Sequence, residues 1–330
     1  MRNITQAIRK QGRSLVVAGF ALAAGTAMLA LFVSPPVIGS GGYASGGVET
    51  CMDCHDAASD HPADNILHTA HGVSADSRTP MADANLQCQA CHGMSEDHLT
   101  RRADGTRPSP EISFDRHTSA EVKSEACLSC HQGTPGVHWA GSTHQFEDVA
   151  CTDCHSLHVD FRDPVFSAEQ QPTVCFECHT RQRAELLRPH RHPVQTSHFT
   201  SDTGLLACTD CHNPHGGAGD GNLKRLTLNE TCYDCHAEMR GPFLWEHAPV
   251  REDCTTCHVP HGSVHASLLK QRPPHLCQQC HLAQFHPSGV RSGLGVPPGG
   301  ADQNILGQSC VNCHSNVHGS NHPSGVRFTR

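Results

Sequence analysis

The sequence is poor in the side chains that usually fill a protein interior. Only 5% of its 330 residues are aromatic, and its 37% of hydrophobic residues includes all 20 Cys. This composition excludes a large side-chain core of the ordinary kind. Two interpretations remain: a disordered chain, or a chain whose interior is filled by something other than side chains.

Basic patches with interleaved aromatic residues are also absent from the sequence, which argues against nucleic acid as a partner. The formal net charge of −8 counts side chains only. Any bound charged group would change it, so the net charge identifies no partner by itself.

The first 44 residues have the composition of an export signal. Basic residues up to Arg13 precede the apolar run Leu15–Val33, and small residues near Ala44 offer a cleavage site. We therefore expect residues 1–44 to be a signal peptide cleaved after Ala44. The alternative is a retained N-terminal anchor, because the run is long enough to cross a bilayer.

Where apolar side chains are scarce, the sequence has 20 Cys and 29 His, and every Cys belongs to one of ten CxxCH motifs. CxxCH is the attachment signal of c-type haem, in which two thioethers hold the porphyrin and the adjacent His binds iron. Disulfides and zinc are the alternatives for paired cysteines, but neither requires a His after every second Cys. The sequence therefore predicts ten covalent haems, which would also supply the missing apolar interior.

The residues predicted to hold these haems follow directly from the motifs, numbered one to ten in chain order. The attachment cysteines are Cys51, Cys54, Cys88, Cys91, Cys127, Cys130, Cys151, Cys154, Cys175, Cys178, Cys208, Cys211, Cys232, Cys235, Cys254, Cys257, Cys277, Cys280, Cys310 and Cys313. The motif histidines, each predicted to bind its own iron, are His55, His92, His131, His155, His179, His212, His236, His258, His281 and His314.

Methionine, the other common sixth ligand of haem iron, is scarce. After residue 44 only Met52, Met81, Met94 and Met239 occur, and Met52 lies inside a motif. Subtracting the ten motif histidines leaves 19 of the 29, enough for a second His at every iron. Bis-His haems have lower reduction potentials than His/Met haems and no open position for a substrate. This pattern favours electron transfer over catalysis.

Four motifs are followed closely by another His. CTDCHNPH, from Cys208, contains His215; the same spacing gives His158 and His261, and the looser CVNCHSNVH gives His318. Three extended residues span only about 10 Å, too little to pass around a porphyrin edge held by the motif's own cysteines. We therefore expect each of these histidines to bind the iron of a neighbouring haem.

Other candidate sixth ligands lie outside the CxxCHxxH pattern. His144 and His247 recur in register, each separated by six residues from the next motif. Further candidates are His71, His98, His192 and His286, with His198 as an alternative to His192 and His322 as an alternative to His318. The remaining histidines are interpreted as surplus: His61, His68, His117, His138, His190, His265 and His275.

The motif spacing contains an internal repeat. The motifs at Cys151, Cys208 and Cys254 are followed 24, 24 and 23 residues later by a plain CxxCH motif. Stacked haem pairs of this kind form a quasi-linear array. We therefore expect an elongated multihaem cytochrome c: a mostly irregular chain with short helices, some following CH pairs, packed around ten haems, with little or no β-structure. A loop-like stretch near residue 200 divides it into pentahaem halves, 45–200 and 201–330.

Several segments of the chain resemble a known family. GPFLWEHAPV (Gly241–Val250), CTTCHVPHGSV, LCQQCH and SNVHGSNHPSG (Ser315–Gly325) are similar to segments of the MtrA/DmsE/PioA-type decahaem cytochromes. The resemblance covers all ten motifs. It implies a periplasmic haem wire, associated with the outer membrane and inserted in a porin-like β-barrel. The implied partners are that barrel, periplasmic or inner-membrane cytochromes, and an extracellular multihaem cytochrome.

The resemblance also implies which histidines are sixth ligands: His71, His98, His144, His158, His192, His215, His247, His261, His286 and either His318 or His322.

Three functions are therefore compared. The first is a non-enzymatic decahaem wire between periplasm and cell exterior, serving extracellular metal reduction or Fe(II) oxidation, because a wire conducts in both directions. The second is a soluble periplasmic electron shuttle to a terminal reductase. The third is a multihaem reductase, for example of nitrite type, which would need at least one iron without a protein sixth ligand.

Overall fold

The structure is a computed structural model, and it describes residues 41–159, 163–194, 205–281, 309–323 and 325–329. Its contacts divide the chain after Ile38, and Gly39–Arg330 forms one unit. Nearly all of the predicted signal segment, and the boundary predicted at residue 200, lie outside the described residues. The division into two pentahaem halves therefore stays a prediction.

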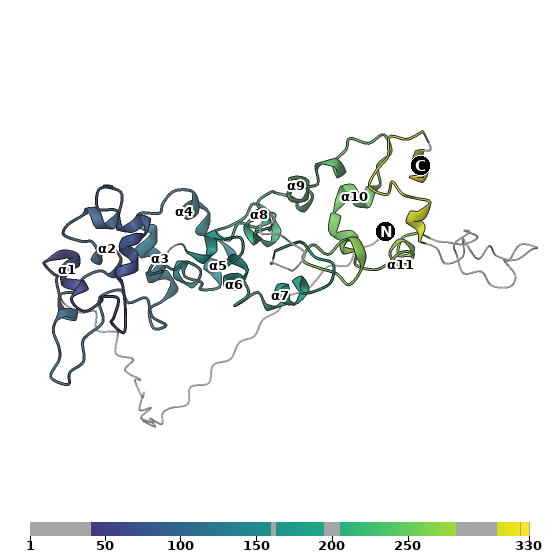
Figure 1. Cartoon of the computed structure of the whole chain (residues 1–330). Coiled ribbons are helices and arrows are strands. Elements are labelled where there is room, and N and C mark those ends of the chain that lie inside the picture. The colour runs from purple at the N-terminus through teal and green to yellow at the C-terminus, as the bar shows by residue number, and fades with distance from the viewer. Residues whose placement is uncertain (1–40, 160–162, 195–204, 282–308, 324, 330) are drawn as a thin grey trace, which may run out of the picture. The chain divides into compact units, whose positions relative to one another are not determined.

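Short helices joined by irregular segments make up the described chain (Figure 1). The α-helices are α1 Gly47–Met52, α2 Gln89–His92, α3 Ala120–Leu128, α4 Thr134–Trp139, α5 Thr143–Phe146, α6 Gln171–Cys175, α7 Thr180–Leu186, α8 Cys208–Cys211, α9 Leu228–Tyr233, α10 Ala248–Glu252 and α11 His275–Gln278. The 3₁₀ turns are η1 Asp64–His68, η2 Ala70–Gly72, η3 Pro80–Ala82, η4 Asp97–Leu99, η5 Cys151–Asp153, η6 Pro164–Phe166, η7 Asp220–Asn222, η8 Ala237–Met239, η9 Cys254–Thr256, η10 Ala266–Leu268, η11 Cys310–Asn312 and η12 Gly325–Arg327.

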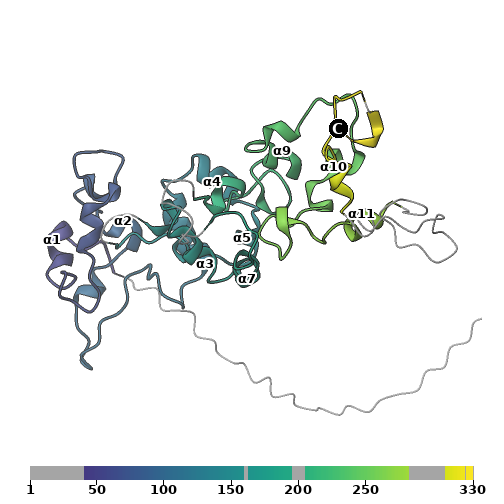
Figure 2. The same ribbon diagram turned by 45° about the vertical axis from the view of Figure 1, so that its right-hand side comes forward.

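The described residues contain no strand, and turning the molecule reveals no sheet (Figure 2). Only isolated β-bridges occur there, such as the one between His190 and Ser263. The predicted combination of short helices, irregular chain and little β-structure is confirmed. Among the described helices, none has both the length and the apolarity needed to cross a bilayer.

Several short helices lead into a haem-attachment motif. Helix α3 begins after Ser119, whose hydroxyl accepts the Val122 N–H at 3.3 Å, and it runs into Cys127. Thr227 and Glu230 form a capping box at the start of α9, which pairs N–H groups that have no partner inside the helix. Helix α7 instead follows a CH pair, as the sequence predicted for some helices.

All ten motifs share one turn. In each, the backbone N–H of the motif His donates to the carbonyl of the first Cys, at N···O distances of 2.8–3.1 Å. This turn holds the two sulfurs and the imidazole in the same relative positions at every motif.

Three buried polar side chains, here called the motif clamps, join an odd-numbered motif to the next even-numbered one. Ser124 in α3 accepts the backbone N–H of Cys151 at 3.4 Å, and Asn229 in α9 accepts that of Cys254 at 2.8 Å. Gln171 in α6 accepts the backbone N–H of Thr209, the second residue of motif six, at 3.0 Å. All three side chains are buried, so these bonds are protected from water and orient successive motifs.

The side-chain core of the described residues is small, as the composition predicts. Its hydrophobic cluster consists of Phe176, Leu186 and Val194, with Leu206 and Cys208 packed against it. So small a core cannot by itself offset the conformational entropy of a chain of this length. Bound haems would supply the missing apolar contact.

Candidate haem-iron sites

Nine motif histidines each lie against one non-motif His. Their ring centroids are 5.9–6.5 Å apart, and no described motif His contacts another motif His ring at this range. The pairs are His55–His98, His92–His158, His131–His71, His155–His215, His179–His144, His212–His261, His236–His192, His258–His318 and His281–His247.

These separations fit an iron between the rings. A metal–imidazole bond is about 2 Å long, so two rings bound to opposite sides of one metal have centroids about 6 Å apart. The His155–His215 pair illustrates the fit, with a centroid distance of 6.0 Å and rings only 7° from parallel. Direct stacking of the two rings would bring their centroids closer. The donor set therefore fits haem iron bound by two histidines.

Backbone carbonyls fix the tautomer of many of these rings. The Nδ1–H of His55 donates to the His61 carbonyl at 2.8 Å, and that of His98 to the Pro108 carbonyl at 2.6 Å. A carbonyl can only accept, so Nδ1 carries the proton and the Nε2 lone pair is free for a metal. Equivalent carbonyl bonds hold His92, His144, His192, His212, His247, His258 and His314.

Two rings have a carboxylate instead of a carbonyl beside Nδ1. The Nδ1 of His155 lies 2.6 Å from an oxygen of Asp163, and the Nδ1 of His261 lies 3.3 Å from an oxygen of Glu185. Neither acid was singled out from the sequence, because neither belongs to a motif or has a fixed spacing from one.

Burial keeps several of the paired rings neutral. Desolvation lowers the pKa of His71, His92, His215, His261 and His318, and each neighbouring imidazole in the pair lowers it further. A neutral imidazole is the form that binds a metal. The chain therefore presents these rings in the form that iron requires.

The short CxxCHxxH segments contribute to two neighbouring sites at once. His215 faces the ring of His155, and the carbonyl just before it, of Pro214, accepts from the Nδ1–H of His144 at 2.8 Å. The arrangement recurs where His192 donates to Pro260 O, which precedes His261, and where His247 donates to Val317 O, which precedes His318. One peptide thus connects the distal rings of motifs four and five, of six and seven, and of eight and nine.

The attachment cysteines lie beside one another in chain order. The first cysteines of motifs one and two, three and four, five and six, seven and eight, and nine and ten are close enough to shift each other's pKa: Cys51–Cys88, Cys127–Cys151, Cys175–Cys208, Cys232–Cys254 and Cys277–Cys310. The second cysteines are close enough to interact electrostatically across the intervening steps: Cys91–Cys130, Cys154–Cys178, Cys211–Cys235 and Cys257–Cys280. Each motif therefore neighbours the next, from one to ten.

Neighbouring thiols shift one another's pKa. The thiol of Cys88 lowers the pKa of Cys51 to about 7, and that of Cys127 lowers the pKa of Cys151 to about 6. In the other direction, burial, followed by the charge of Cys254, raises the pKa of Cys232 to about 12. These shifts reflect the proximity of the sulfurs of successive motifs together with their burial.

The structure gives no support to disulfides or zinc at the motifs. All 20 cysteines lie within the described residues and are free thiols. Within the same ranges, no group of three or more His, Cys, Asp or Glu side chains is arranged to hold a metal ion. A structural zinc ion requires four such ligands, whereas haem iron takes only two axial ligands from the protein.

Nine of the ten predicted distal histidines thus lie against a motif His. The tenth, His286, and the alternative His198 lie outside the described residues. His192 faces His236, and His318 faces His258. The motif clamps and the carbonyl acceptors were not predicted from the sequence. The only indication of the clamps there is a polar residue three or four positions before an odd-numbered motif.

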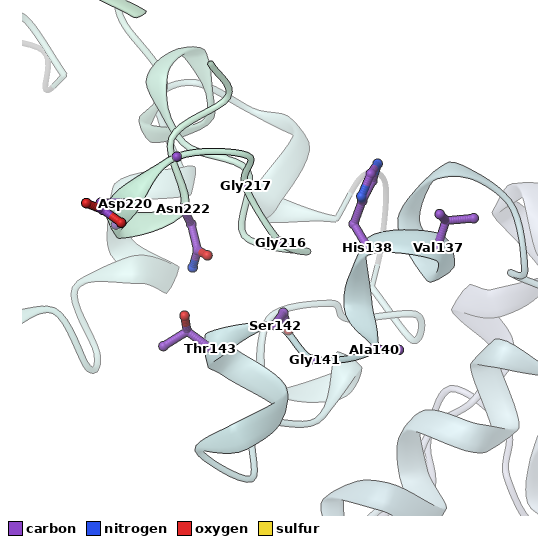
Figure 3. A pocket seen from close by; sticks show the side chains of 12 residues that line it. Val137, His138, Ala140, Gly141, Ser142, Thr143, Gly216, Gly217, Asp220 and Asn222 are labelled. Atoms are coloured by element: carbon purple, nitrogen blue, oxygen red, sulfur yellow. The ribbon is translucent and has the colours of Figure 1, made fainter. Parts of the chain in front are cut away.

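A hollow of about 400 Å³ lies between the α4–α5 segment and the loop after α8 (Figure 3). Gly216 and Gly217 lie opposite Gly141 and Thr143, and none of the paired histidines lines it. Gly216 has φ +128°, and a Cβ there would lie 2.3 Å from the His138 carbonyl oxygen. The glycine allows a close approach of backbones beside His215, and the hollow carries no chemistry of its own.

Comparison with known proteins agrees with these features. Residues 144–184, 198–241 and 247–285 match the family described as doubled CXXCH motif. The chain is 44% identical over 294 residues to multiheme cytochrome MtrA of Shewanella baltica strain OS185, covering 88% of this chain and 83% of that protein. It is also 25% identical over 190 residues to C-type polyheme cytochrome OmcB of Geobacter sulfurreducens, covering 54% of this chain and 21% of OmcB.

Proposed function

The chain belongs to the MtrA family of multihaem c-type cytochromes, which are electron-transfer proteins, and from this premise we propose that it conducts electrons between the periplasm and the cell exterior. It does so as a ten-haem wire inside an outer-membrane porin-like barrel. Its further partners are periplasmic or inner-membrane cytochromes and an extracellular multihaem cytochrome. The sequence leaves both directions of flow open.

The observation that supports this proposal is the proximity of consecutive attachment motifs from one to ten. Each link uses either a pair of first cysteines or a pair of second cysteines that interact electrostatically, as between Cys127 and Cys151 and then between Cys154 and Cys178. Haems attached at these positions would be neighbours in one series. An electron entering at one end would therefore have a continuous series of carriers to the other end.

The haem irons cycle between Fe(III) and Fe(II), and the protein supplies two imidazoles to each. We assign the nine contacting pairs as axial ligands and pair His314 with His286. With both axial positions taken, no iron has an open position for a substrate, which disfavours the reductase. The Nδ1–H bonds to carbonyls hold the rings in place, so that little reorganisation accompanies each electron transfer.

The experiment is reconstitution of the holoprotein with its barrel in liposomes that contain an internal dye reduced by electrons from outside. We expect exchange between the interior and external Fe(II) or Fe(III) only when barrel and cytochrome are both present. The matched control is the barrel with a cytochrome that lacks Cys208 and Cys211, which interrupts the series. Exchange that needs no barrel, or a cytochrome that never co-purifies with one, would instead support a soluble shuttle.

A further inference from the structure

Two of the paired rings have a buried carboxylate beside Nδ1. His155 donates to Asp163 and the Nδ1 of His261 lies 3.3 Å from Glu185, whereas rings such as His55 and His98 donate to neutral carbonyls. His155 belongs to motif four, and His261 faces His212 of motif six. The two carboxylates therefore lie on either side of motif five, in the middle of the series.

Both carboxylates are shielded from water. The Asp163 side chain is 8% exposed and that of Glu185 is 11% exposed. A charge–charge interaction is several times stronger at such sites than in bulk water. The Val165 N–H also donates to the second oxygen of Asp163 at 3.2 Å, which fixes the carboxylate toward His155.

We propose that Asp163 and Glu185 lower the reduction potentials of the haems at motifs four and six below those of their neighbours. A carboxylate that accepts from Nδ1–H makes the imidazole a stronger electron donor through Nε2, and hydrogen bonding around ligands tunes redox potential. The negative charge stabilises Fe(III) relative to Fe(II). When one electron reduces the iron, no bond forms or breaks, and the proton stays on Nδ1, shared with the carboxylate.

The two acids act through the histidines, so they are tuning residues and not ligands. Their effects are unequal. Asp163 is 2.6 Å from its ring, and its only ion pair among the described residues is with His155. Glu185 is 3.3 Å from its ring, and its other oxygen lies 3.1 Å from the Arg181 guanidinium, which neutralises part of its charge. Asp163 therefore has the larger effect.

The consequence for the series is an alternating potential at its centre. An electron passing motifs three to seven meets an uphill step at four, a downhill step at five, and the same sequence at six and seven. This inference rests on the axial pairs assigned under the proposed function, but it does not depend on the barrel.

The test is a potentiometric titration of the purified holoprotein, followed by haem absorbance. Asp163→Asn keeps an acceptor oxygen and removes the charge. We expect it to change the ferric-to-ferrous ratio of one haem in ten about tenfold at a fixed potential, equal to an upward shift of about 59 mV. Glu185→Gln should shift one haem upward by less, and Arg181→Gln should shift the same haem downward.

The matched control is Glu238→Gln. Glu238 is exposed and lies 3.7 Å from the Nδ1 of His236, too far for a hydrogen bond, so its titration should equal that of the wild type. An Asp163→Asn curve that also superimposes on the wild type, with every haem still low-spin, would overturn the proposal. A stoichiometric high-spin ferric haem in the wild type would instead refute the axial pairs and leave the carboxylate contacts without a redox role.

If Asp163→Asn does not assemble with ten haems, the Glu185 and Arg181 variants decide. The proposal is supported if the two variants shift the potential of one haem, seen as one tenth of the absorbance change, in opposite directions. Shifts of equal sign, or none, contradict it. Asp163→Glu, which restores the charge, should return the potential toward the wild-type value.

Discussion

At the scale of single residues, His215 joins two attachment motifs. It lies three residues after the motif histidine His212, but its ring faces that of His155. The motif of His155 lies about sixty positions before His215 in the chain. The limited reach of three residues predicted that His215 serves another haem. It could not predict which one, because that depends on how distant segments pack. The same holds for Asp163, whose importance follows only from its contact with His155.

Replacing His215 by Ala should remove the sixth ligand of the iron at motif four. The iron at motif six should keep both of its axial ligands. We expect one high-spin ferric haem in ten by EPR. The signal should vanish when Cys151 and Cys154 are also replaced, since that removes the affected haem. His138→Ala is the control, because His138 is exposed and pairs with no motif His. A signal that disappears only on loss of Cys208 and Cys211 would contradict the assignment.

Gly216, directly after His215, gives a second prediction at this scale. Gly216→Ala places a Cβ 2.3 Å from the His138 carbonyl oxygen and forces Ala to adopt φ +128°. Left-handed strain and overpacking together should destabilise the fold by about 3 kcal/mol, measured as a lowered midpoint in guanidinium. Gly133→Ala is the control, since no atom lies within 4 Å of a Cβ built there. Equal midpoints for the two variants would show that the local backbone yields without cost.

At the scale of elements, the short helices orient the attachment motifs and are not stable units by themselves. Helices of four to nine residues are marginal in water by themselves, so their positions depend on caps and on contacts with the next motif. The sequence predicted their short length and irregular connections from motif density. It did not predict the motif clamps, because the pattern of a Ser, Gln or Asn before a motif does not distinguish a buried side chain from an exposed one.

Asn229 offers the clearest test of a clamp. Its Nδ2 donates to the carbonyls of Val250 and Arg251, both at 3.0 Å, and its Oδ1 accepts from Cys254 N–H. Asn229→Ala leaves these groups without that partner and should cost about 2 kcal/mol, seen as a lower thermal midpoint. The exposed Asn85 supplies the control, Asn85→Ala, with no expected change. A thermal midpoint for Asn229→Ala equal to that of the control would show that the clamp bonds add nothing to stability.

At the scale of the whole molecule, the ring pairs follow two rules. An even-numbered motif faces a His that follows the motif two places later, as His155 faces His215. An odd-numbered motif from three onward faces a His between the two motifs before it, as His179 faces His144. Motif one has no motifs before it, so the second rule cannot apply to it. Its histidine, His55, faces His98, which follows motif two. These rules connect each motif to later or earlier parts of the chain and so hold the series together.

The same reasoning predicts the tenth distal ligand. Motif ten has no motif two places later, and the His between motifs nine and ten is His286, which has no motif eleven to serve. By analogy with His98 at the other end, His286 should bind the iron opposite His314. His286→Ala is therefore expected to give one high-spin ferric haem in ten and a ferrous form that binds one carbon monoxide. His322→Ala, the matched variant of the competing residue, should leave all ten haems low-spin and unreactive. The reverse result would assign the last iron to His322, and the end of the series would then depart from the pairing rule that governs its beginning.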